Sequence, residues 1–212
     1  MTKTLLYLFD PLCGWCYGAS GTVAEVSALP GVALRLLPSG LFSGEGARPM
    51  NDDFATYAWS NDQRIERLTG QRFTEQYRGN VLADHRQMFD SGPATVALTA
   101  IALTAPQREL DALKAIQLAR YVDGRDVTSL ETLMAVLKTL GLDEAARRLA
   151  QPDAELLAAN RARVAEAQAL LQQFGARGVP TFILEQNGQR QLLPSSAVFS
   201  NPQAFVEQLA AA

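Results

Sequence analysis

Two cysteines, Cys13 and Cys16, stand three positions apart and are the only cysteines in the chain. They follow a short apolar run and Pro11, the order expected of a strand, a turn and the start of a helix. Side chains at positions i and i+3 of a helix share one face, so the two sulfurs can reach each other. A Cys-x-x-Cys pair in that context indicates thiol–disulfide redox chemistry.

The two thiols are expected to play different roles. Cys13 starts the helix, where unpaired N–H groups and the positive end of the helix dipole favour a thiolate, so it is the expected nucleophile. Cys16 lies one turn deeper, and we expect it to be more buried and to act as the resolving thiol. Gly14 leaves the nucleophile uncovered, and Trp15 offers a flat apolar surface to a substrate.

The cysteine pair has three other interpretations. A zinc site of the Cys/His type needs four ligands, and His85 is the only other soft ligand, so we expect no metal. A structural disulfide across so short a loop would remove almost no conformational entropy from the unfolded chain, so it would stabilise the fold little. A further alternative is that the two cysteines are buried and inert. Their position at a strand-to-helix turn argues against it.

Composition narrows the class of protein further. The chain has 212 residues, of which 48% are hydrophobic, and a net charge of −3 from 19 basic and 22 acidic side chains. It can therefore bury a core, and it lacks the basic surface of a protein that binds nucleic acid or anionic membranes. Its longest apolar stretch, 94–105, is too short to cross a bilayer, and no secretory signal is apparent, so we expect a cytoplasmic protein.

The elements that position the cysteines begin with a β-α-β unit. The apolar run 5–9 predicts a strand buried on both faces, 13–29 a helix, and 32–37 a second, parallel strand. From 44 to 174 the composition becomes helical. We expect short polar helices near 52–60, 62–68 and 74–81, then longer ones over 93–105, 108–122, 129–140 and 153–174.

Residue patterns typical of β-strands return after the helical region. Residues 181–185 predict a strand, Asn187-Gly188 a hairpin turn, 191–193 the return strand, and 201–209 a final helix that Asn201 caps. The expected fold is α/β, with a four-stranded mixed sheet flanked by helices. Residues 1–43 and 175–212 form the sheet domain, and 44–174 form a large helical insertion.

A second motif, near the C-terminal end of the chain, points to a family that this sequence resembles. The sequence Gly-Val-Pro-Thr-Phe enters the strand at 181, with a Cys-x-x-Cys helix elsewhere in the chain. Together with the segments 10–18, 38–42 and 89–94, it resembles the DsbA-like thioredoxin-fold disulfide oxidoreductases, most closely their FrnE-like cytosolic branch. The resemblance spans essentially the whole chain. It implies that Cys13 and Cys16 are the redox pair and that Pro180 is the cis-proline beside them.

The resemblance also implies where substrate binds. At one position, however, this chain departs from the family pattern. The backbone of Val179 is expected to pair with an extended substrate segment beside Pro180. Many relatives carry a buried acidic relay residue six positions before the nucleophile, where this chain has Tyr7. Asp10 is the nearest acid, and it is expected to be either a proton relay or a cap for the helix. His85 is expected on a surface helix, without a catalytic role.

The expected function is thiol–disulfide exchange on protein or peptide substrates, with its direction open. No cofactor is expected beyond the redox pair, and glutathione or a thioredoxin-type protein would recycle it. One alternative is a glutathione-dependent isomerase or transferase resembling the kappa-class transferases and chromene-carboxylate isomerases, which need no second cysteine. Another is a binding module in which the cysteines have no redox role.

Overall fold

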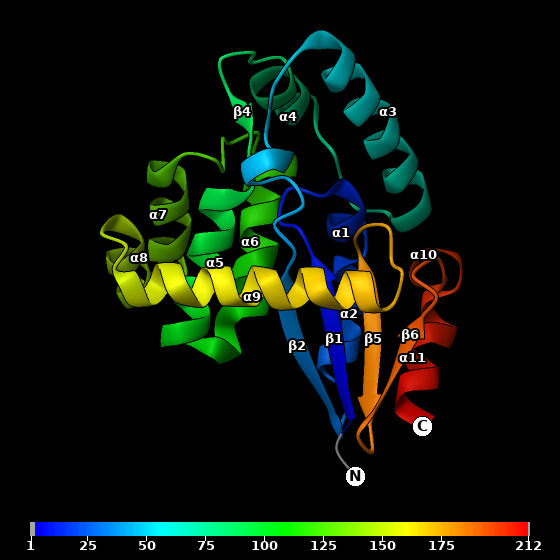
Figure 1. The fold of residues 1–212 in the computed structure, drawn as a ribbon. Helices are drawn as coiled ribbons and strands as arrows, with labels where there is room; N and C mark the ends of the chain where they lie inside the picture. The colour runs from blue at the N-terminus through cyan, green and yellow to red at the C-terminus, as the bar shows by residue number, and fades with distance from the viewer. Residues whose placement is uncertain (1–2, 212) are drawn as a thin grey trace.

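A four-stranded mixed sheet, built from the two ends of the chain, forms the base of the molecule (Figure 1). The computed structural model describes residues 3–211. The strands are β1 (Lys3–Phe9), β2 (Val32–Pro38), β5 (Thr181–Gln186) and β6 (Gln189–Leu193), in the order β2-β1-β5-β6. β1 pairs with β2 in parallel, and the other two pairings are antiparallel. The predicted four-stranded mixed sheet is confirmed, with longer strands than the sequence indicated.

The central strand β1 is apolar from Leu5 to Phe9 because helices cover both of its faces there. Leu5 and Tyr7 belong to a core shared with α2 and α11, whereas Leu6 and Leu8 face a second core formed with α9. Side chains alternate between the faces of a strand, so a strand covered on both sides must be apolar at every position.

Helices make up most of the rest of the chain. They are α1 (Gly14–Gly18), α2 (Ser20–Ser27), α3 (Asp52–Thr69), α4 (Glu75–Tyr77), α5 (Gly92–Thr104), α6 (Glu109–Tyr121), α7 (Leu130–Thr139), α8 (Asp143–Ala150), α9 (Ala154–Gln173), α10 (Ala197–Ser200) and α11 (Pro202–Ala211). Short 3-10 turns occupy Gly44–Gly46 and Pro106–Arg108, a π-helical turn Arg78–Leu82, and a two-residue ladder joins β3 (Arg48–Pro49) to β4 (Met88–Phe89). No helix in the described part of the chain is both long and apolar enough to cross a membrane.

Several predicted helix boundaries were wrong. The expected helix 13–29 is divided at Ala19, and the two segments expected at 52–60 and 62–68 are one continuous helix, α3. The helix α8 was not predicted from the sequence; its exposed face is charged and its short buried face includes Leu149. The expected helix 93–105 is confirmed as α5, and it forms the buried centre of the helical region, since Leu98 and Ile101 are fully buried.

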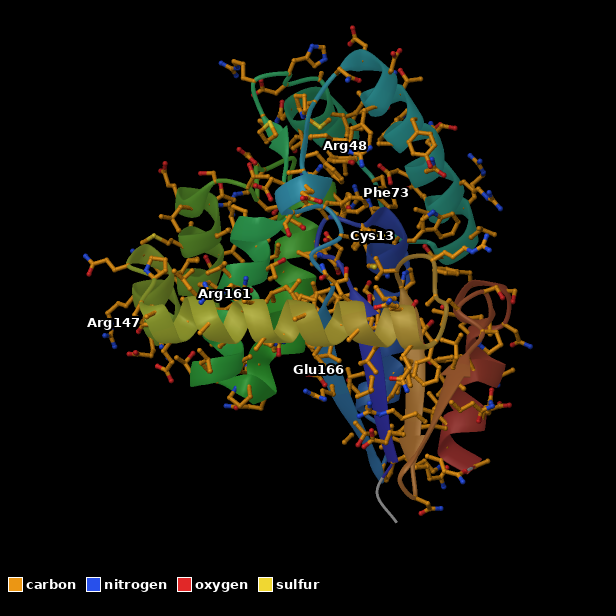
Figure 2. The ribbon with its side chains drawn as sticks, in the orientation of Figure 1. Cys13, Arg48, Phe73, Arg147, Arg161 and Glu166 are labelled. Atoms are coloured by element: carbon orange, nitrogen blue, oxygen red, sulfur yellow. The ribbon has the colours of Figure 1, made fainter. Side chains whose placement is uncertain are left out.

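The long helix α9 connects the helical region to the sheet. Figure 1 shows it crossing in front of β2, β1 and β5. Its Glu166, labelled in Figure 2, accepts two hydrogen bonds from Arg35 on β2, at 2.7 and 2.6 Å. The buried positions of α9 are Leu156, Ala167 and Leu170, whereas Leu157 is 39% exposed.

Candidate active site

Cys13, labelled in Figure 2, lies where β1 passes into α1, beneath α3, and Cys16 lies within α1. After β1 the chain turns, and the backbone N–H of Cys13 donates to the carbonyl of Asp10 at 3.1 Å. Cys13 is the N-terminal cap residue of α1, in extended conformation, and Cys16 follows within the helix. Both thiols are free. The structure therefore presents a dithiol at the start of a helix, as the sequence predicted.

Burial separates the two thiols. Cys16 is completely buried, whereas Cys13 keeps 6% of its surface exposed and lines a pocket. Burial raises the pKa of the Cys16 thiol well above its ordinary value, and the neighbouring Cys13 raises it further. The prediction that Cys16 is the deeper thiol is confirmed. Cys13 is less open than the sequence indicated, because α3 lies over it.

The segment that precedes β5 reaches the cysteines from the other end of the sequence. The Val179–Pro180 peptide bond is cis. The Cys13 thiol donates to the carbonyl oxygen of Val179 at 3.6 Å, Val179 is partly exposed, and Pro180 is buried. The structure therefore brings the predicted residues of both motifs together.

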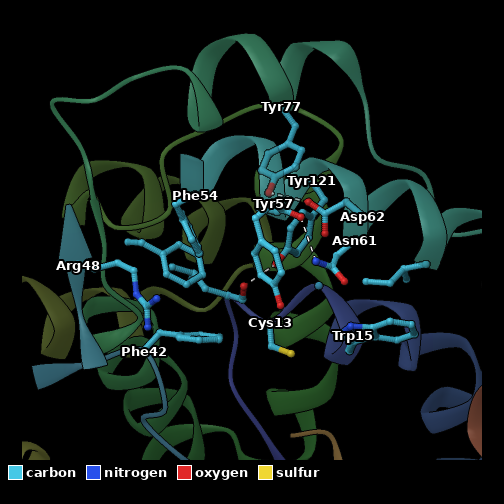
Figure 3. Close-up of a pocket in the computed structure, with 15 residues that line it drawn as sticks. Cys13, Trp15, Phe42, Arg48, Phe54, Tyr57, Asn61, Asp62, Tyr77 and Tyr121 are labelled. Atoms are coloured by element: carbon cyan, nitrogen blue, oxygen red, sulfur yellow. Dashed lines mark hydrogen bonds between the residues drawn. The ribbon is translucent and has the colours of Figure 1, made fainter. Parts of the chain in front are cut away.

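A pocket of about 320 Å³ opens above Cys13 (Figure 3). Gly14 and Trp15 line it next to the cysteine, as the sequence analysis expected of residues facing a substrate. The other lining residues, which the sequence analysis did not single out, are Leu12, Phe42, Arg48, Phe54, Tyr57, Ala58, Asn61, Asp62, Ile65, Tyr77, Phe89 and Tyr121. The wall is thus largely aromatic and aliphatic, with few polar groups, which is the usual character of a small-molecule or peptide site.

The helix α3 supplies one wall of this pocket and a buried acid. Asp62 is 4% exposed, and its Oδ2 accepts a hydrogen bond of 3.0 Å from the hydroxyl of Tyr77. The signal was present in the sequence, since Phe54, Ala58, Asp62 and Ile65 recur at helical spacing. It was missed because the polar composition favoured two exposed helices, and because charged residues are seldom buried.

Comparison with known proteins agrees with this geometry. The family model of the DSBA-like thioredoxin domain matches residues 4–210. The chain belongs to this DSBA-like family. A search of curated proteins gives no match.

Among solved structures, this DSBA-like chain is similar to a protein described as the cytosolic disulfide reductase DsbM from Pseudomonas aeruginosa. The two share 34% identity over 97% of this chain and 96% of that one, with a TM-score of 0.87. A structure of the same reductase with GSH gives 31% identity, the same coverage and a TM-score of 0.82. A 2-hydroxychromene-2-carboxylate isomerase, at 18% identity over 97% and 95% of the two chains and a TM-score of 0.60, shares the fold alone.

In this DSBA-like site, Asp10 joins three segments of the chain. Its carboxylate is fully buried and accepts hydrogen bonds from Leu12 N–H at 2.9 Å, Phe42 N–H at 3.1 Å and the Ser91 hydroxyl at 2.7 Å. No side chain caps α1, so the interpretation of Asp10 as a helix cap was wrong. Ser91 also makes no cap bond to α5, because its hydroxyl is directed at Asp10.

Tyr7 and His85 lie apart from the pocket. The Tyr7 hydroxyl donates to the backbone carbonyl of Cys16 at 3.2 Å, and burial together with the two cysteines raises the pKa of Tyr7 well above its ordinary value. A phenol with so high a pKa does not exchange protons readily near neutral pH. His85 lies in a turn, where its Nε2 is 3.2 Å from Asp52 Oδ1, so the expected surface helix was wrong.

The buried Asp62 predicts a pH-dependent stability. Burial raises its pKa from 3.8 to about 7, so its contribution to folding is fully present below the unfolded pKa and is lost as the pH rises through 7. Asp62→Asn removes the charge and keeps an acceptor for Tyr77. One pKa unit corresponds to ~1.4 kcal/mol. Between the unfolded and the folded pKa of Asp62, we therefore expect the unfolding free energy of the wild type, relative to that of Asp62→Asn, to fall by at most about 4 kcal/mol.

Urea unfolding of both proteins between about pH 4 and pH 8 measures this difference. Gln63→Ala, on the exposed side of the same helix, is the matched control and should follow the wild-type curve. Parallel curves for wild type and Asp62→Asn would show that Asp62 is ionised at the same pH in the folded and unfolded chains.

Proposed function

We propose that this protein exchanges disulfides with protein or peptide substrates through Cys13 and Cys16. The observation that carries the proposal is the arrangement of two free thiols, one lining a pocket and the other buried directly behind it. The raised pKa of Cys16 keeps that thiol protonated while Cys13 reacts. Membership of the DSBA-like family supports the same chemistry.

The reaction proceeds in two exchanges. The Cys13 thiolate attacks one sulfur of the substrate disulfide, the substrate S–S bond breaks, and the other sulfur leaves with the electron pair and takes up a proton. Cys16 then loses its proton and attacks the Cys13 sulfur of the mixed disulfide, which releases the second substrate thiol. The protein is oxidised to a Cys13–Cys16 disulfide as the substrate gains two electrons and two protons.

The pocket and the Val179–Pro180 segment would hold the substrate on two sides of Cys13. The pocket volume of about 320 Å³ suits a tripeptide or a short loop. Trp15 is fixed by an edge-to-face contact with Phe199, at 5.0 Å between ring centroids, and offers its apolar surface at the rim. Val179 would pair through its backbone with an extended substrate segment.

Similarity to the Pseudomonas reductase favours the reductive direction and glutathione as the recycling thiol. That protein is described as cytosolic and as a disulfide reductase, and one of its structures contains GSH. Two glutathione molecules would return the Cys13–Cys16 disulfide to the dithiol and leave as glutathione disulfide, which balances the two electrons. A reducing cytosolic compartment would suit this direction.

The glutathione-dependent isomerase or transferase alternative has weaker support. The isomerase likeness extends to the fold alone, and that chemistry needs one activating residue, whereas Cys16 lies directly behind Cys13 here. Incubation of the reduced protein with glutathione disulfide, followed by alkylation and mass spectrometry, separates the two. Exchange yields an intramolecular Cys13–Cys16 disulfide, whereas the alternative leaves Cys16 as a free thiol throughout.

A further inference from the structure

Asp62 places a carboxyl group directly over the redox motif. Its Oδ1 lies against Gly14, so closely that a Cβ atom at that position would be 2.5 Å away. The hydrogen bond from Tyr77 occupies the other oxygen, Oδ2. Asp62 and Cys13 line the same pocket, and Figure 3 shows them on facing sides of it. One oxygen of a buried acid therefore lies against the residue that follows Cys13, and the acid shares a pocket with that cysteine.

The charged and titratable groups around Asp62 come from several elements. Tyr77 donates to it, and the buried Arg120 guanidinium, 5.5 Å from the Tyr77 ring centroid, adds a favourable positive charge. Tyr121 and Cys13 face it from α6 and from the start of α1, and Arg48 lies at the exposed rim. Burial is the largest effect and raises the pKa of Asp62 to about 7.

Asp62 is the one buried acid in the pocket wall that can exchange a proton near neutral pH. Burial raises the pKa values of Tyr77 and Tyr121 well above their ordinary value. The Tyr121 hydroxyl, moreover, donates to the carbonyl of Leu12 at 2.7 Å. The two phenols are therefore committed to structural hydrogen bonds.

The exchange reaction needs a proton donor at this place. When Cys13 attacks a disulfide, the leaving sulfur departs as a thiolate into a largely apolar pocket, where an unpaired charge is costly. We propose that Asp62 is the general acid that protonates this leaving sulfur, and the general base that accepts the proton of an incoming thiol in the reverse direction. This inference rests on the proposed function.

The proposed step balances. The Cys13 thiolate, the substrate disulfide and protonated Asp62 become a Cys13 mixed disulfide, a free thiol and the Asp62 carboxylate. The Cys13 sulfur is oxidised, the leaving sulfur is reduced, and the proton moves from Asp62 to that sulfur. Reprotonation of Asp62, by the next incoming thiol or by solvent, completes the cycle.

The test compares two disulfides with different leaving groups. Glutathione disulfide releases an alkyl thiolate that needs a proton, whereas 5,5′-dithiobis(2-nitrobenzoate) releases an aromatic thiolate that is stable without one. Stopped-flow kinetics give the rate constant of the reduced protein with each disulfide. We take the ratio of the rate with glutathione disulfide to the rate with the aromatic disulfide, because the ionisation of Cys13 affects both rates equally and cancels. We expect this ratio to fall in the wild type as the pH rises through about 7, since only protonated Asp62 can donate.

Three variants make the test specific. In Asp62→Asn we expect the ratio to be pH-independent and, at about pH 6, roughly 10²-fold below that of the wild type, the lower end of general acid catalysis. In Tyr77→Phe the fall should move to higher pH, because the Tyr77 hydrogen bond lowers the pKa of Asp62. Gln63→Ala, on the exposed side of the same helix, should match the wild type.

The outcomes separate the two proposals. A wild-type ratio in Asp62→Asn, or an equal loss of rate with both disulfides at every pH, would overturn the role of Asp62 as a general acid. Tyr77→Phe retains the carboxyl group, so an unmoved pH profile in that variant would overturn it even if Asp62→Asn failed to fold. A reduced wild-type protein that reacts with neither disulfide would instead refute the proposed function.

Discussion

A Cys16→Ser variant is expected to accumulate mixed disulfides with a disulfide-bonded protein, and a Cys13→Ser variant to accumulate none. Cys13 lines the pocket and can attack, whereas Cys16 is completely buried and can reach only the sulfur of Cys13. Loss of Cys16 therefore stops the reaction after the first exchange. The effect is all-or-none, because no other cysteine in the chain can resolve the adduct.

Non-reducing electrophoresis after incubation with a disulfide-bonded protein measures the adducts. A reducing lane identifies them as disulfides, and thermal unfolding of each variant shows whether it is folded. The double variant lacking both thiols is the matched blank. Adducts formed by Cys13→Ser but not by Cys16→Ser would reverse the assignment of nucleophile and resolving thiol.

Replacement of Asp10 by Ala is expected to have the largest effect on stability. The change leaves the N–H groups of Leu12 and Phe42 and the hydroxyl of Ser91 without their buried acceptor. At roughly 1–3 kcal/mol for each unsatisfied group, the loss should be about 5 kcal/mol. Because these groups come from three separate segments, the loss should also loosen the turn that carries Cys13.

Urea unfolding of Asp10→Ala and Ser91→Ala at neutral pH tests this expectation. Ser91→Ala is the matched control, because it removes one donor together with its bond and leaves the two N–H groups paired with Asp10. We expect it to cost about 1 kcal/mol. If the two variants were equally stable, Asp10 would not hold the three segments together.

The sheet and the position of the cysteine pair at a helix start could be predicted because their signals are local. The run from Leu5 to Phe9 is apolar at every position, the Cys-x-x-Cys motif follows a turn, and Gly-Val-Pro precedes a strand. Each pattern has few structural interpretations, and the parallel β-α-β connection follows from the order of elements. The sequence therefore indicated a four-stranded mixed sheet, and the family resemblance added that Pro180 lies beside the cysteines.

The pocket and its acid could not be predicted in the same way, because they depend on tertiary packing. The position of α3 over Cys13 follows from contacts such as that between Gly18 and Ile65, where an added Cβ would lie 2.5 Å from the isoleucine side chain. The helical spacing places Asp62 on one face with Phe54 and Ile65, but it does not show that this face is buried over Cys13. Nothing local marks Ser91 as a partner of Asp10 instead of a helix cap. Such pairings across long stretches of chain appear only once the fold is known.

The redox equilibrium of the Cys13/Cys16 pair with glutathione buffers tests the central claim most directly. The protein is equilibrated over a range of ratios of reduced to oxidised glutathione, its thiols are alkylated, and the oxidised fraction is measured by mass spectrometry. We expect one two-electron transition between the dithiol and an intramolecular disulfide, with a potential nearer about −270 mV than about −120 mV, as suits a reductant. Two cysteines that never join in an intramolecular disulfide would contradict the account, and a potential near about −120 mV would contradict the reductive direction.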